Sequence, residues 1–134
     1  MNLILAFIDA HMDYLWEGDR YSVVGSQSRS SNGGDALLVV ESPTLRLRFV
    51  RDRGQLLLDF QPAAEHRDEW WSVDLVRRLL LGRPEPSAVL DESYAAFLGE
   101  HLTEVEARFG AERWPATRDE LKKLKVRRSK EMWG

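Results

Sequence analysis

The sequence predicts an α+β fold in which an N-terminal helix and a four-stranded antiparallel sheet precede three C-terminal helices packed on one sheet face. Apolar residues recur with helical spacing at the start of the chain, alternate along short runs in the middle, and return to helical spacing after residue 70. The turns between the central runs are short, and short turns join antiparallel strands. A length of 134 residues suits a single domain, residues 1–134.

The first element is predicted as an amphipathic helix over residues 2–17. Asn2 is suited to cap its start, and Gly18 is suited to end it. One side of this helix is apolar, as expected for a helix that covers a core. The apolar positions are Leu3, Ile4, Phe7, Ile8, Met12, Leu15 and Trp16.

Four strands are expected next. Residues 21–28 alternate weakly and predict an exposed strand, and residues 36–42 predict a second strand after a loop over residues 30–35. The third and fourth strands come from the run LRLRFVRDRGQLLLDF, residues 45–60, in which leucine and phenylalanine alternate with polar residues. The predicted core-facing residues are Leu38, Val40, Leu45, Leu47, Phe49, Leu56, Leu58 and Phe60.

Two turns set the expected register of these strands. A tight turn at residues 43–44, where proline presets φ, places Val40 opposite Leu47. A four-residue connection at residues 51–54 then places Leu47 opposite Leu58.

The same registers align charged residues on the other sheet face. Glu41, Arg46 and Asp59 fall in one row, with Arg48 beside it. Such a row is usually a solvated face that contributes little to stability. The alternative is a polar binding surface.

A polar linker over residues 61–69 leads from the sheet to Trp70 and Trp71. Adjacent tryptophans cannot both point inward from a regular element. We therefore expect one of them to close the edge of the core and the other to be an exposed anchor for a partner.

Three helices follow the tryptophans. The first runs from a cap at Ser72 to Gly82, and the second covers about residues 91–109. A capping box at residues 117–120 predicts the start of the last helix. Its apolar line is thin, so we expect it to dock on a body that folds without it. That line consists of Leu121, Leu124 and Met132.

Charge is distributed unevenly along the chain. Residues 1–117 carry 12 arginines and 19 carboxylates, a formal −7, whereas residues 118–134 carry 7 cations and 3 carboxylates, a formal +4. The sequence thus predicts an acidic body with a basic last helix. No cysteine is present, which excludes disulfides and thiolate sites and fits a cytoplasmic protein. Neither a signal peptide nor a membrane span is expected.

No pattern in the sequence indicates a catalytic or metal site. The three histidines, His11, His66 and His101, are scattered, and no cofactor is expected. Three functions stay open: a small enzyme without a recognisable motif, a nucleic-acid-associated protein that uses the basic helix, and a non-enzymatic protein-binding domain, which we favour. The candidate partner-binding residues are Glu41, Arg46, Arg48, Asp59, Glu65, Asp68, Glu69, Trp70 and Trp71.

A resemblance narrows the third function. The runs LRLRFVRDRGQLLLDFQP, EWWSVDLVRRLLLG and FLGEHL, with the closing EMWG, resemble small bacterial immunity proteins of polymorphic toxin systems. The resemblance implies a protein that neutralises a cognate toxin by direct binding, without catalysis. This class shares no functional motif, so no residue role carries over. An acidic body would suit a basic toxin through fast, complementary association.

Overall fold

The computed structural model describes residues 1–28, 35–65 and 69–133. The fold is α+β with an antiparallel sheet, which confirms the predicted fold class. The described elements are α1 (Asn2–His11), the 3₁₀ segment η1 (Asp13–Asp19), β1 (Ser22–Ser28), β2 (Ala36–Glu41), β3 (Leu45–Asp52), β4 (Gln55–Pro62), β5 (Trp71–Ser72), α2 (Val73–Leu81), α3 (Glu92–Phe109) and α4 (Trp114–Trp133).

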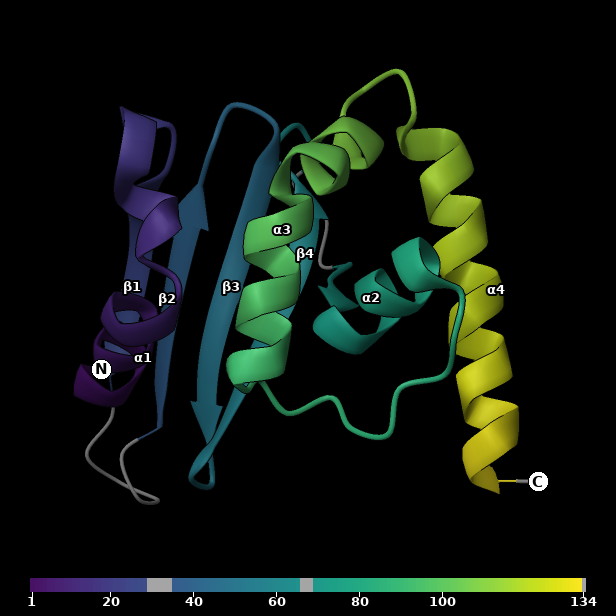
Figure 1. The fold of residues 1–134 in the computed structure, drawn as a ribbon, viewed down its shortest axis with the longest axis horizontal. Coiled ribbons are helices and arrows are strands. Elements are labelled where there is room, and N and C mark those ends of the chain that lie inside the picture. Colours follow the sequence, from purple (N-terminus) through teal and green to yellow (C-terminus); the bar gives the residue numbers. More distant parts are fainter. Residues whose placement is uncertain (29–34, 66–68, 134) are drawn as a thin grey trace.

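The described part of the chain forms a five-stranded sheet in the order β1-β2-β3-β4-β5, one strand more than predicted. The added strand β5 is a two-residue segment in which Trp71 lies opposite Phe60. Figure 1 shows α1, η1 and α3 over one face of the sheet, with α2 beside its β4 end and α4 outside α2. The last helix thus packs on α2 and α3, and the three C-terminal helices do not form one layer directly on the sheet.

The strand registers are correct for one hairpin and shifted for the next. Val40 lies opposite Leu47, as the turn at residues 43–44 predicts. In the β3–β4 pair, however, Leu47 lies opposite Phe60, two positions beyond the predicted partner. The reason is a two-residue turn, Arg53-Gly54, whose φ angles of 53° and 81° are both positive, as a type I′ turn requires. A shift of two leaves every side chain on its predicted face.

The apolar face of the sheet forms the core beneath the helices. Leu56 is half-buried, and the other predicted core-facing strand residues are fully buried. Ile4 and Ile8 from α1 and Tyr94 and Leu98 from α3 belong to the same cluster. One continuous core therefore joins the first helix, the sheet and the third helix.

The helix predicted over residues 2–17 is divided in two. Met12 leaves the helical conformation, with φ of −135°, and η1 follows. Within η1, the Tyr14 hydroxyl donates to the Ala95 carbonyl oxygen of α3 at 2.6 Å. A Cβ on Gly99 would lie 2.9 Å from the Tyr14 ring, so the glycine permits this close approach. The packing of Tyr14 on α3 thus accounts for the break.

The last helix begins earlier and contributes more to the core than predicted. It starts at Trp114, and Thr117 lies inside it with its N–H donating to the Arg113 carbonyl oxygen at 3.0 Å. The predicted capping box at residues 117–120 is therefore wrong. Trp114 and Leu121 are both buried, so α4 supplies core side chains from its first turn onward.

Candidate partner-binding surfaces

The first candidate is the charged sheet face, which we define as Glu41, Arg46, Arg48, Asp59 and Gln61. Arg46 lies opposite Glu41, as predicted, and its Nε is 3.5 Å from Glu41 Oε1. The predicted row through Asp59 is wrong because of the two-residue shift: Arg46 faces Gln61 instead, and its Nη1 donates to Gln61 Oε1 at 2.9 Å. Asp59 pairs with Arg48, whose Nη2 donates to Oδ2 at 2.7 Å.

The two adjacent tryptophans point to opposite sides of the sheet. Trp71 is in the core, 2% exposed, and its ring centroid lies 6.5 Å from that of Trp114. Trp70 is half-buried over the charged sheet face, with its ring 4.5 Å from the Arg48 guanidinium carbon and 5.5 Å from that of Arg46. Trp70 is thus the one of the two that is placed to meet a partner.

Two of the acidic residues that precede Trp70 in the chain interact with an arginine of α4. Arg118 of α4 makes a two-pronged contact with Glu69, with Nε 2.8 Å from Oε1 and Nη2 3.3 Å from Oε2. Glu65, half-buried, also lies close enough to raise the Arg118 pKa, after the larger effect of the Glu69 hydrogen bond. Asp68 lies outside the described residues.

Opposite charges therefore balance across the charged sheet face and its border. Arg46, Arg48 and Arg118 each contact a carboxylate, of Glu41, Asp59 and Glu69 respectively. Within these three ion pairs the charges cancel, Glu65 beside Arg118 adds one negative charge, and Trp70 covers two of the guanidiniums. Among the described residues, this face presents an aromatic anchor within a polar surface, and most of its carboxylates are neutralised by arginines.

The second candidate is the acidic layer, which lies on the helices that cover the opposite sheet face (Figure 1). Residues 1–20 carry four carboxylates and one arginine, and residues 91–109 carry five carboxylates and one arginine. These two segments together have a formal charge of −7, against −3 for the whole chain. We define the acidic layer by its exposed carboxylates, which are Asp9, Asp13, Glu17, Asp19, Asp91, Glu92, Glu100 and Glu104.

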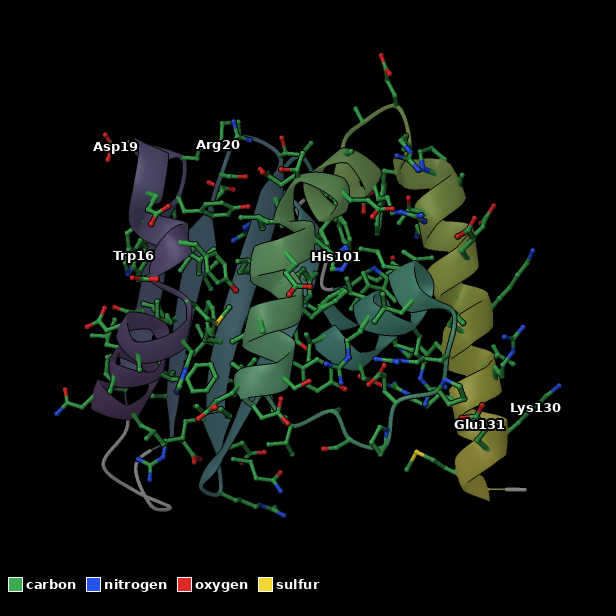
Figure 2. The ribbon with its side chains drawn as sticks, in the orientation of Figure 1. Trp16, Asp19, Arg20, His101, Lys130 and Glu131 are labelled. Carbon is green, nitrogen blue, oxygen red and sulfur yellow. The ribbon has the colours of Figure 1, made fainter. Side chains whose placement is uncertain are left out.

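The fold concentrates this charge by bringing η1 against α3. Within the described residues, no ion pair involves Asp9, Asp13, Glu17 or Glu100, whereas Glu106, behind the layer, is held by Arg20 at 2.7 Å. Figure 2 shows Asp19 and Trp16 on the same end of the molecule, and Trp16 is half-buried. The layer thus combines unpaired carboxylates with a partly exposed aromatic ring.

The sequence analysis did not predict that these carboxylates lie together on one surface. The carboxylates of the first helix and the acidic outer positions of the third helix are both visible in the sequence, about 80 residues apart. Their proximity depends on the contact of Tyr14 with α3. The spacing of apolar residues in the sequence does not predict this contact. A count of charges by segment, with no lysine or arginine before Arg20, is the signal that was available.

A cleft of about 610 Å³ between α2, residues 85–88 and the end of α4 is lined by charges that pair with one another. Arg128 Nη1 lies 2.9 Å from Asp74 Oδ2, and Arg78 Nη1 lies 3.0 Å from Glu131 Oε2. These pairs join α2 to α4 over part of the core edge. We assign them to the packing of the last helix.

In the described part of the chain, no cluster of three or more histidine, aspartate or glutamate side chains is arranged to hold a metal ion. Among the described helices, none has the length and apolar character needed to cross a bilayer. Comparisons of the chain with protein-family models, with curated proteins and with solved structures yield no match.

Proposed function

We propose that this protein is a non-enzymatic binding domain that captures a basic protein partner through the acidic layer. The observation that carries the proposal is the concentration of −7 on two helical segments of a chain whose total is −3. Unpaired carboxylates on one face steer an oppositely charged partner and speed its association. Trp16, half-buried beside them, is of the residue type that most often anchors an interface.

In its most specific form, the proposal is that the partner is a bacterial toxin and that binding neutralises it. The resemblance to immunity proteins supports this form, and a basic toxin domain fits an acidic capture face. The charged sheet face, with Trp70 at its surface, is a second contact region that a large partner would reach from the β4–β5 side. The two faces differ in their expected effect, since Trp70 acts by burial and the acidic layer by long-range attraction.

If a toxin gene neighbours the gene of this protein, its toxin domain is the partner for a surface plasmon resonance test of the proposal. Reversal of three unpaired carboxylates, by Asp13→Lys, Glu17→Lys and Glu100→Lys, should slow association at least tenfold at low salt and leave dissociation nearly unchanged. The matched control reverses three exposed carboxylates outside the layer, by Asp52→Lys, Glu112→Lys and Asp119→Lys.

The control variant changes the net charge by the same amount as the first variant. A difference between their association rates therefore reports the position of the charges and not the total charge. Equal association rates for the two triple variants would remove the acidic layer as the capture face. Tight binding without any effect on toxin activity would keep the binding function and remove the immunity role. Growth of cells that co-express toxin and either variant gives that second measurement.

A further inference from the structure

The outward face of α4 carries four cations that form no ion pair within the described residues. Residues 121–130, LKKLKVRRSK, contain six cations and no carboxylate. Arg128 is held by Asp74 at 2.9 Å, and the Lys125 ammonium lies 5.6 Å from the ring centroid of Trp71. Within the described residues, no ion pair involves the remaining four, which are Lys122, Lys123, Arg127 and Lys130, all exposed. We call these four residues the basic stripe.

The basic stripe faces solvent because the other side of α4 is buried. Leu121 is fully buried and Arg128 turns toward Asp74, which directs the helix face around Val126 outward. Val126 is 57% exposed among the four cations. Lys130, labelled in Figure 2, extends away from the body of the molecule. The long side chains are thus free to meet a ligand.

Of the three carboxylates on α4, two contact arginines of other helices, while Asp119 is exposed one helical turn before Lys123. Glu131 pairs with Arg78 at 3.0 Å, and Glu120 lies 3.8 Å from Arg108 of α3. The first part of the acidic layer, on α1 and η1, lies at the other end of the longest molecular axis from α4 (Figure 1). The carboxylates of α1 and η1 are therefore largely screened from the stripe at moderate salt, since exposed charges more than about 10 Å apart interact weakly there.

We propose that the basic stripe binds the phosphodiester backbone of nucleic acid, without reading its sequence. Lys123, Arg127 and Lys130 follow one another at intervals of four and three residues, which places them on one line along the helix. At about 1.5 Å of rise per residue they span roughly 10 Å. Along the axis of a duplex each strand carries one phosphate per about 3.4 Å, so about three phosphates of one strand fall within that axial length. The number of cations and the number of phosphates agree.

The chemistry of the stripe favours a backbone ligand over other polyanions. Between Lys122 and Lys130 the exposed apolar neighbour of the stripe is Val126, so this stretch of the helix lacks the aromatic and long aliphatic groups by which a helix inserts into a lipid interface. It also lacks the amide and aromatic side chains that read base edges or stack on bases. Binding of this kind is weak, with Kd of about 10⁻⁴ to 10⁻⁶ M at physiological salt, and strongly salt-dependent. It is independent of the proposed capture of a basic protein, which uses carboxylates of α1, η1 and α3 rather than the cations of α4.

Fluorescence anisotropy with short labelled duplexes of mixed sequence, one of DNA and one of RNA, tests the inference. The variant Lys123→Gln, Arg127→Gln, Lys130→Gln should lose at least tenfold in affinity at about 50 mM salt. On duplex DNA, the slope of log affinity against log salt should fall in magnitude by about 2.7, since each contacted phosphate contributes about 0.9. The control variant Arg53→Gln, Arg83→Gln, Arg113→Gln removes three exposed cations from other elements and should keep the slope of the unchanged protein.

Three results would overturn the inference. One is the absence of any anisotropy change at low salt with the unchanged protein. Another is an equal loss of affinity and slope in the two triple variants, which would mean that total charge alone acts. The third is stronger binding to phosphatidylserine-containing vesicles than to either duplex, again dependent on the stripe, which would assign the helix to a membrane surface. Binding to both duplexes supports a backbone ligand, and binding to one of them supports it and identifies the polymer.

Discussion

Trp70 and Trp71 are adjacent in the chain, yet their surroundings differ completely. Trp71 sits in β5 opposite Phe60 and against Trp114, while Trp70 covers the guanidinium groups of Arg46 and Arg48. The rule that neighbouring side chains of an extended segment point to opposite faces predicts that one is inside. It does not predict which, because that depends on the pairing of β5 with β4, a two-residue contact that leaves no periodic pattern in the sequence.

Substitution of each tryptophan by alanine should separate the two roles. Trp71→Ala should lower the free energy of unfolding by about 3–5 kcal/mol, the usual range for removal of a buried aromatic ring. Trp70→Ala should cost only about 0.5–2 kcal/mol, since it removes partly exposed cation–π contacts. Urea denaturation followed by circular dichroism measures both. Similar losses for the two variants would show that Trp70 is also a core residue.

At the scale of elements, the alternation of apolar and polar residues predicts which side chains share a sheet face, but it does not predict the register of every β-hairpin. Alternation assigns the sheet faces correctly, and the proline turn sets the β2–β3 register. The β3–β4 register is missed by two residues because Arg53 takes a positive φ, which is uncommon for a residue other than glycine, asparagine or aspartate. The predicted charged row inherits this error: Glu41 and Arg46 lie opposite each other as predicted, but Gln61 takes the place of Asp59, which lies opposite Arg48 instead.

The last helix gives the prediction at this scale. A chain that ends after Arg113 loses Trp114, which stacks on Phe109 with ring centroids 5.0 Å apart, and the buried Leu121. Each of these side chains is worth roughly 2–5 kcal/mol, and a whole domain has only about 5–15 kcal/mol of stability. We therefore expect the shortened chain to lose cooperative unfolding.

Thermal denaturation followed by circular dichroism checks this expectation. A chain that ends after Glu131 serves as the control, because it retains the ion pairs of α4 with Asp74 and Arg78, and it should melt near the temperature of the full chain. A sharp transition in the chain that ends after Arg113 would make α4 an appendage on an independently stable body, as the thin apolar line of the sequence suggests.

At the scale of the whole molecule, the tyrosines predict how stability depends on pH. Burial is the main cause that raises the pKa of Tyr94 to about 12, and it also raises the pKa of Tyr14 and Tyr21. In the unfolded chain each phenol has a pKa of about 10. Above that pH the unfolded state is increasingly stabilised by ionisation, so stability is full below about pH 10 and is lost as pH rises through the folded pKa.

The midpoint of urea denaturation should therefore fall steeply between about pH 10 and pH 12. The chain contains three tyrosines, so tyrosinate absorbance should rise together with unfolding rather than before it. Tyr94→Phe, which keeps the ring beneath Arg77, should show a shallower fall. An identical pH profile for this variant would mean that Tyr94 does not contribute to the alkaline loss of stability.

The separation of the acidic segment α1–η1 from the basic helix α4 has a consequence beyond attraction. A molecule with opposite charges at the two ends of its long axis has a dipole moment, and the field of an approaching ion exerts a torque on it. A cationic protein would rotate the molecule so that α1 and η1 lead, and a polyanion would rotate it so that α4 leads. Orientation would thus be decided before contact, and the two kinds of ligand would arrive at opposite ends without competing for one surface.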